Sequence, residues 1–161
     1  MTEKNQHANH PESLPALVLF DGFCHLCNRS VDFIMKRDSS HHFRFVALQS
    51  EAGAFLRSRL GLEERDDSVI LLKEGKLYYR SDAALRIALQ LKFPWPLMGL
   101  FLIIPRFMRD RIYSFIANNR YRWFGIRDAC RYPSIEERDL FPSRDDLELQ
   151  VSRFVEPEQL R

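Results

Sequence analysis

Two cysteines three residues apart are the residues of this sequence best suited to chemistry. Cys24 and Cys27 lie in the stretch LVLFDGFCHLCNRSVDFI, residues 17–34. On a helix, residues i and i+3 share a face, close enough for a disulfide to form with little backbone movement. Zinc sites use the same spacing, and two structural thiols can also lie close together. Three interpretations therefore have to be compared: a redox pair, half of a metal site, and two structural thiols.

The residues around the pair favour redox chemistry. Cys24 is expected at a helix start, where free N–H groups and the helix dipole favour a thiolate, and His25 adds a possible positive charge beside it. Cys27, one turn further along an apolar stripe, is expected to be the more shielded and less acidic thiol, as suits a resolving cysteine. Asp21 either accepts a proton from Cys27 during exchange or forms an Asx turn with Gly22. The pattern predicts dithiol–disulfide exchange with Cys24 as the nucleophile.

A zinc site is the main alternative for the cysteines. Structural zinc takes four ligands, often from two Cys-x-x-Cys pairs. The sequence holds one such pair, a lone Cys130 and the neighbouring His41 and His42. A zinc-stabilised interaction module using Cys24, Cys27 and Cys130 therefore stays an alternative, although we predict neither a metal nor an organic cofactor. Cys130 itself is expected to be a small buried hydrophobe or, less favoured, a third redox thiol near Cys24.

The surrounding sequence predicts the elements that would present this motif. Residues 17–20 form a short apolar run before Asp-Gly, as a buried strand does before a turn, and apolar residues recur at helical spacing over residues 25–37. Further strands are predicted at 43–48, 69–72 and 77–79, the last two as a hairpin, and further helices at 50–60 and 81–91. The resulting order, β-α-β-α-β-β-α, predicts an α/β domain.

Composition describes an ordinary globular protein. The chain has 161 residues, a formal net charge of +2 and 45% hydrophobic residues, which fits one domain and indicates no class of partner. Three cysteines are too few for a secreted disulfide scaffold, and the N-terminal residues lack the apolar core of a signal peptide. The apolar stretch from Trp95 to Pro105 has eleven residues, whereas a membrane span needs about 20. We therefore predict a cytoplasmic location.

With Asp-Gly-x-Cys-x-x-Cys placed between a strand and a helix, the chain resembles the DCC family of thiol-disulfide oxidoreductases. Asp21, Cys24 and Cys27 match the one Asp and two Cys that give the family its name. The resemblance continues in DSVILL, YRSDAAL and IPRFMRDRIYSFIANNRYRWFG and at Cys130, and so covers about residues 16–132. It implies a thioredoxin/glutaredoxin-like three-layer α/β fold and an oxidoreductase activity.

On this basis we divide the chain into four parts. We expect a disordered N-terminal arm at 1–14, a thioredoxin-like domain at 15–93, a helical extension packed on it at 94–132 and an acidic C-terminal tail at 133–161. Residues 104–132 hold seven arginines and two aspartates. We do not expect nucleic-acid binding, because aromatic residues interleaved with arginine on a helix are more often core. A non-catalytic membrane-surface adaptor, in peripheral contact through residues 94–107, is a less favoured alternative.

The expected partner is a protein or a small thiol or disulfide, glutathione among them. In glutaredoxins the helix start after the fourth strand holds the γ-glutamyl carboxylate of glutathione, and the corresponding residues here are Arg80, Ser81 and Asp82. A helix N-terminus offers free N–H groups to such an anion. The other interpretation is that Ser81 and Asp82 only cap the helix.

Overall fold

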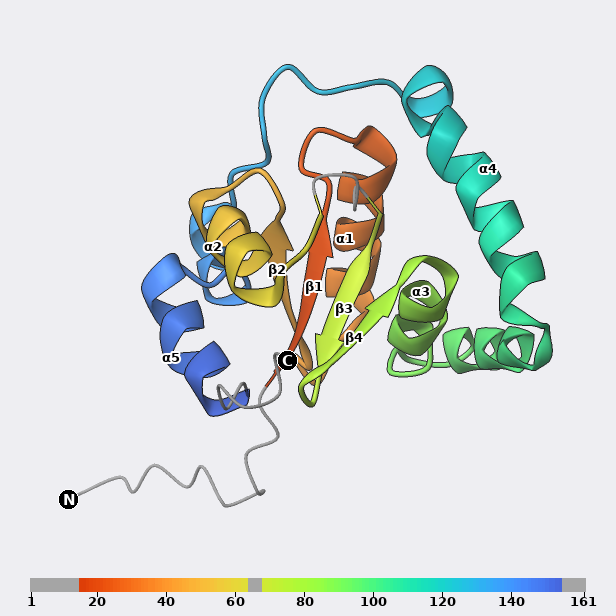
Figure 1. Cartoon of the computed structure of the whole chain (residues 1–161), viewed down its shortest axis with the longest axis horizontal. Coiled ribbons are helices and arrows are strands. Elements are labelled where there is room, and N and C mark those ends of the chain that lie inside the picture. The colour runs from red at the N-terminus through yellow and green to blue at the C-terminus, as the bar shows by residue number, and fades with distance from the viewer. Residues whose placement is uncertain (1–14, 64–67, 155–161) are drawn as a thin grey trace.

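A four-stranded mixed sheet forms the centre of the molecule (Figure 1). The computed structural model describes residues 15–63 and 68–154, so the arm predicted at 1–14 lies outside the described residues. The strand order is β2-β1-β3-β4. Strand β1 is parallel to β2 and antiparallel to β3, which pairs with β4 in a hairpin. The strand bounds are β1 Ala16–Phe20, β2 Phe43–Ala47, β3 Ile70–Lys73 and β4 Lys76–Tyr79.

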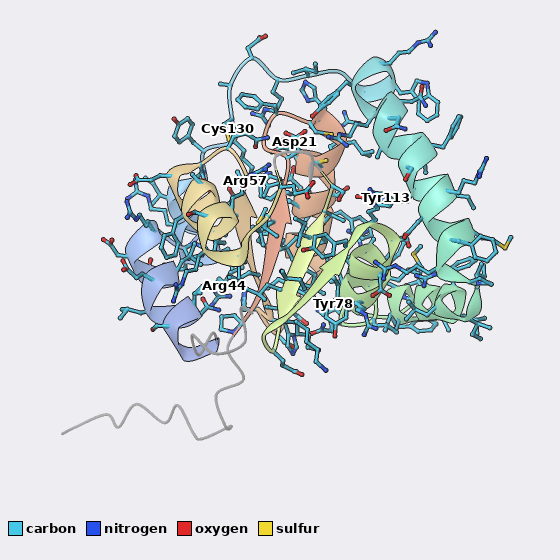
Figure 2. All side chains as sticks on the ribbon, viewed as in Figure 1. Asp21, Arg44, Arg57, Tyr78, Tyr113 and Cys130 are labelled. Carbon is cyan, nitrogen blue, oxygen red and sulfur yellow. The ribbon has the colours of Figure 1, made fainter. Side chains whose placement is uncertain are left out.

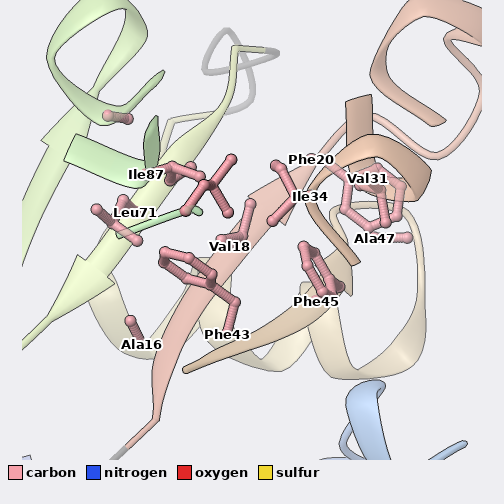
Figure 3. Packing of buried hydrophobic residues seen from close by; sticks show 12 residues of the cluster. Ala16, Val18, Phe20, Val31, Ile34, Phe43, Phe45, Ala47, Leu71 and Ile87 are labelled. Atoms are coloured by element: carbon pink, nitrogen blue, oxygen red, sulfur yellow. The ribbon is translucent and has the colours of Figure 1, made fainter. Parts of the chain in front are cut away.

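Helices cover both faces of the sheet, which gives the three layers of the predicted thioredoxin-like α/β fold. Helices α1 (His25–Arg37) and α3 (Arg80–Ala88) pack on one face, and α2 (Glu51–Leu60) and α5 (Arg144–Phe154) pack on the other. Strand β1 is buried on both sides: Val18 and Phe20 contribute to the core under α1, shown in Figure 3, and Leu17 and Leu19 to the core under α2. This double burial explains why its sequence is apolar throughout.

Local signals in the sequence set several of these bounds. Helix α2 begins after Ser50, whose side chain accepts a hydrogen bond from Gly53 N at 3.0 Å, and ends at Gly61, which adopts the left-handed conformation. In the β3–β4 hairpin, Glu74 and Gly75 both have positive φ, as a two-residue type I′ turn requires. The predicted strand, helix and hairpin positions up to residue 79 are confirmed to within two residues.

Beyond α3 the chain forms a helical extension. A 3-10 helix, η1 (Trp95–Ile103), leads into the long helix α4 (Arg106–Phe124), which lies at the side of the molecule against α1 and α3. Tyr113 projects from α4 toward the strands (Figure 2), where its hydroxyl accepts a hydrogen bond from Val69 N at 3.1 Å. The chain then crosses back over the end of the sheet to a second 3-10 helix, η2 (Ile135–Leu140), and to α5.

The segment predicted as an acidic C-terminal tail, residues 133–161, contributes to the core. The prediction of a tail did not include this packing. Leu147 and Val151 on α5 are fully buried against α2 and the sheet. They lie four residues apart and therefore on one face of the helix, with the acidic residues Asp145 and Glu148 exposed. This helix closes the second face of the sheet, so the segment has a structural function.

Candidate active site

The Cys-x-x-Cys motif lies where it was predicted, at the junction of β1 and α1. Cys24 is the N-cap of α1, and its Sγ accepts a hydrogen bond from the backbone N–H of Cys27 at 3.3 Å. Asn28, the residue after Cys27, holds the preceding loop in place. Its Nδ2 donates hydrogen bonds to Gly22 O at 2.9 Å and to Cys24 O at 2.8 Å. The N–H group of Cys27 and the positive end of the helix dipole favour the thiolate form of Cys24.

The order of exposure within the pair is the reverse of the prediction. Cys24 is 0% exposed, whereas Cys27 is half-buried. The chain after α4 covers Cys24: a single antiparallel β-bridge joins it to Ile126, and Arg127 N donates to Phe23 O at 2.8 Å. The prediction that Cys27 is the more shielded thiol was therefore wrong, because a segment a hundred residues away returns to cover the helix start.

The acidity of the two thiols follows the predicted order. A hydrogen bond from the Cys27 side chain is the main cause that lowers the pKa of Cys24 from 9.0 to about 6, against the opposing effect of burial. The same hydrogen bond and burial raise the pKa of Cys27. The positive charge that contributes to the Cys24 shift is Arg120. His25, which was expected to supply that charge, is exposed and lies beside Gly125 instead.

Asp21 is buried at the end of β1 and ties three segments together. Its Oδ1 accepts hydrogen bonds from Phe23 N at 3.0 Å and from Gln49 Nε2 at 2.9 Å, and its Oδ2 accepts from Arg120 Nη2 at 3.2 Å and from the Tyr121 hydroxyl. The contact with Phe23 N is the Asx turn that the sequence suggested. These four bonds fill the acceptor capacity of a carboxylate, so Asp21 positions the loop in this structure, and no bond to Cys27 forms.

Three members of this cluster were missed by sequence reasoning: Gln49, Arg120 and Tyr121. Arg120 is only 7% exposed and pairs with Asp21 across 99 positions of the chain. Tyr121 keeps its proton for the hydrogen bond, because burial and the Asp21 contact raise its pKa to about 12. The sequence did contain one signal for Arg120. It has helical spacing from Tyr113 and Ala117, which places all three on the side of α4 that faces the protein, where a cation needs a buried partner.

Cys130 lies against the active-site loop on the side of Gly22. A Cβ placed on Gly22 would come within 2.5 Å of Cys130 Sγ, so this glycine makes room for the thiol (Figure 2 shows Cys130 near Asp21). Burial raises the pKa of Cys130, which disfavours a thiolate there. Among residues 15–63 and 68–154 no group of three or more His, Cys, Asp or Glu side chains is placed to hold a metal ion.

Two of the predicted glutathione-binding residues, Ser81 and Asp82, contact α4. Helix α3 begins at Arg80 with Tyr79 as N-cap, so neither Ser81 nor Asp82 caps it. Ser81 is buried and donates a hydrogen bond to Asp110 Oδ1. Asp82 forms an ion pair with Arg86 at 3.2 Å. Arg80 is exposed. The N-cap prediction for Ser81 and Asp82 was wrong.

A cavity of about 530 Å³ opens beside the cysteine pair. It lies between α1, α3 and α4, and Cys27 contributes to its wall. Its other lining side chains are mostly apolar, and they include Phe33, Leu85, Trp95 and Ile116. Arg120 also lines it, and its Nε is buried without a hydrogen-bond partner among the described residues. The half-buried thiol of the motif therefore faces an apolar chamber.

Comparison with known proteins places these features in one family. The family model described as DCC1-like thiol-disulfide oxidoreductase matches residues 18–126. The uncharacterized protein YuxK of Bacillus subtilis (strain 168) is 45% identical over 125 residues, which cover 76% of this chain and 91% of that protein. The DCC family protein At1g52590, chloroplastic, of Arabidopsis thaliana is 43% identical over 116 residues, which cover 71% of this chain and 67% of that protein. No solved structure matches. The chain therefore belongs to the DCC1-like thiol-disulfide oxidoreductase family, as its Asp-Gly-x-Cys-x-x-Cys motif indicated.

Proposed function

We propose that the protein catalyses dithiol–disulfide exchange by cycling Cys24 and Cys27 between two thiols and a disulfide. Membership of the family supports a thiol–disulfide redox role in general. The observation that carries the finer proposal is the contact at the helix start, where Cys24 Sγ accepts the Cys27 N–H at 3.3 Å. This contact places the two cysteines one turn apart around a stabilised thiolate.

The exposure of the two cysteines supports a different role for each of them. In the oxidised protein, an incoming thiolate reaches Cys27 Sγ, because Cys24 is fully buried. A bond forms between the substrate sulfur and Cys27 Sγ, the Cys24–Cys27 bond breaks, and its electron pair stays on Cys24. A thiolate with a pKa of about 6 is a good leaving group. A second substrate thiol then attacks the first substrate sulfur, which gives the substrate disulfide and releases Cys27, and Cys27 takes up a proton.

This assignment differs from the sequence-based hypothesis, in which Cys24 is the nucleophile toward the substrate. In the present proposal Cys24 is the internal partner, which leaves when Cys27 is attacked and attacks Cys27 when the disulfide forms again. Asp21 and Arg120 position the loop and its charge. A cytoplasmic location stays a prediction, since the plant relative is named as chloroplastic.

Trapping of a mixed disulfide tests both the activity and the assignment. All variants carry Cys130→Ser, so that the third thiol does not react, and each is incubated with 2-hydroxyethyl disulfide and analysed by mass spectrometry. We expect Cys24→Ser to accumulate a mixed disulfide on Cys27, and Cys27→Ser to accumulate little, because Cys24 is covered. If only Cys27→Ser traps the adduct, the assignment of roles is wrong. If neither does, and the pair forms no disulfide under mild oxidation, the exchange activity itself is refuted.

We also propose that the outer face of η1 and α4 rests on an anionic membrane surface. No helix of the described residues is long and apolar enough to cross a bilayer. We define the outer face by the large apolar side chains that η1 and α4 expose: Leu97, Leu100, Phe101, Ile103, Phe107, Ile112, Phe115 and Trp123. Arg106, Arg111 and Arg122 are exposed among them. Apolar side chains interspersed with arginine fit the boundary between anionic headgroups and acyl chains.

The charge of the outer face favours this partner over a second copy of the chain. A symmetric pair of copies would bring Arg111 and Arg122 of both chains into one interface, where like charges repel and lose their hydration. Anionic lipid neutralises the same arginines. The only acidic residue of η1 and α4 is Asp110, and it lies on the inner side, where it contacts Ser81.

Vesicle binding tests this second proposal. We expect the full chain to sediment with vesicles of phosphatidylcholine and phosphatidylglycerol, and to bind vesicles of phosphatidylcholine alone at least tenfold more weakly. Leu100→Glu combined with Phe101→Glu should abolish sedimentation, whereas Leu149→Glu, an equally exposed site on α5, should not. Absence of binding to the anionic vesicles together with a dimer in gel filtration would show that the outer face joins two copies instead.

A further inference from the structure

The apolar cavity beside Cys27 lacks the charged groups that a glutathione site needs. Glutathione carries two carboxylates and an ammonium group, so a site for it needs cations and at least one acidic acceptor. Among the residues that the structure describes, no Asp or Glu lines the cavity. Of its two lining arginines, Arg29 is exposed, and Arg120 is buried and already paired with Asp21 at 3.2 Å. The cavity therefore suits a neutral and largely apolar molecule.

The chemistry of the cysteine pair limits what that molecule does. A dithiol that becomes a disulfide gives up two electrons and two protons, so the partner must accept both. The cavity also offers one polar contact, because the Arg120 guanidinium, a group of hydrogen-bond donors, contributes to its wall. The partner is therefore an apolar electron acceptor with a carbonyl-type oxygen.

We propose that this cavity binds a quinone and that the quinone oxidises the Cys24–Cys27 pair. The inference rests on the dithiol function proposed above and names the electron acceptor for it. The volume of about 530 Å³ accommodates a substituted benzoquinone ring with the first part of an apolar side chain. A ring oxygen lies toward the Arg120 guanidinium, and the ring packs among apolar side chains such as Phe33 and Trp95.

The redox step balances without a further reagent. Cys27 Sγ adds to the quinone ring and its proton passes to a ring oxygen. The Cys24 thiolate then attacks Cys27 Sγ, so that the S–S bond forms, the S–C bond breaks and its electron pair moves onto the ring. The second ring oxygen takes up the proton that Cys24 had released to solvent. In total, two thiols and one quinone give one disulfide and one hydroquinone.

The arrangement of the pair suits this sequence of steps. The sulfur that must reach the ring is Cys27, which lines the cavity. The sulfur that attacks second is Cys24, which is enclosed by the protein and separated from bulk solvent. Because the attacking thiolate is buried, an oxidant reacts first at Cys27, and Cys24 then completes the disulfide.

Anaerobic oxidation of the reduced full chain by tetramethyl-1,4-benzoquinone tests the proposal. This quinone has no unsubstituted ring carbon, so a thiol cannot remain attached to it by simple arylation. We expect one quinone to be reduced per Cys24–Cys27 disulfide formed, measured by quinone absorbance and by counting free thiols. The same protein is treated in parallel with 2-hydroxyethyl disulfide, a small uncharged disulfide.

Two variants separate the cavity from other routes. Ala84, exposed on α3, lines the cavity, and Ala54 is also exposed, on α2 on the other side of the sheet. Ala84→Trp should slow oxidation by the quinone at least tenfold, while Ala54→Trp leaves it unchanged. Ala117→Phe, which fills the cavity from α4, should slow it as well, with an unchanged circular dichroism spectrum showing that the fold is retained.

The outcomes distinguish this inference from the function on which it rests. Oxidation by 2-hydroxyethyl disulfide without oxidation by the quinone would overturn the quinone proposal and leave dithiol exchange intact. Equal quinone rates in wild type, Ala84→Trp and Ala117→Phe would also overturn it, because the cavity would then not be the site. If neither oxidant forms the Cys24–Cys27 disulfide, the proposed function itself fails.

Discussion

The hydrogen bond between the two cysteine side chains is the leading cause of the low pKa of Cys24. Two substitutions of Cys27 test its contribution. Cys27→Ser keeps a hydroxyl donor at the same position, whereas Cys27→Ala removes the donor. A hydrogen bond to a charged acceptor contributes about 1.5–3 kcal/mol. One pKa unit corresponds to about 1.4 kcal/mol, so losing this bond should raise the pKa of Cys24 by about one to two units, to about 7–8.

The ultraviolet absorbance of the thiolate, followed as a function of pH, measures this shift in the reduced protein. We expect wild type to show one transition with a midpoint of about 6, which disappears in Cys24→Ser. Cys27→Ser should titrate close to wild type and Cys27→Ala clearly above it. Cys130, whose pKa is raised by burial, contributes only at higher pH. A midpoint that stays near 6 in Cys27→Ala would refute the reasoning and leave the helix start and Arg120 as the causes.

Three further predictions concern stability. Arg120→Met should destabilise the protein by about 3–5 kcal/mol in urea unfolding, because it leaves Asp21 buried without its partner, whereas Arg111→Met on the exposed side of α4 should change little. Stability of the reduced protein should rise by a few kcal/mol between pH 6 and 9, because the unfolded chain keeps the Cys24 proton there and the folded chain does not; the rise should be absent in Cys24→Ser. Leu147→Ala should cost about 2–5 kcal/mol and Leu149→Ala, on the exposed side of the same helix, under about 0.5, and equal effects would contradict the packing of α5.

The parts of the fold that were predictable are those specified by neighbouring residues. The Ser50 cap and Gly61 end of α2, and the Glu74-Gly75 turn, act through contacts within a few positions, so the sequence pattern contains them. The Asp-Gly turn before Cys24 is of the same kind, and its Asx hydrogen bond to Phe23 formed as suggested. These local signals were sufficient to place both cysteines at the start of α1.

The parts that were not predictable depend on contacts between distant segments. Cys24 is covered by the segment at Ile126, with which it forms a β-bridge. No sequence pattern near residue 24 predicts this contact. The support of Asp21 by Arg120 and Tyr121 likewise requires knowing where α4 lies. For α5 a signal did exist, since Leu147 and Val151 have helical spacing, but the high acidic content of the segment concealed it.

The four hydrogen bonds to Asp21 have a consequence for where this protein can be cut or joined to another. A fragment that ends at residue 93 would contain every strand of the described residues and both cysteines of the motif, and would resemble a complete small domain. It would lack Arg120 and Tyr121, and with them the two groups that hold Oδ2 of Asp21, as well as the bridge at Ile126 that covers Cys24. The match of the family model, which ends at residue 126, includes all three. The smallest unit that keeps the active-site loop as described is therefore larger than the thioredoxin-like domain, and fusions or excised versions should retain the chain beyond α4.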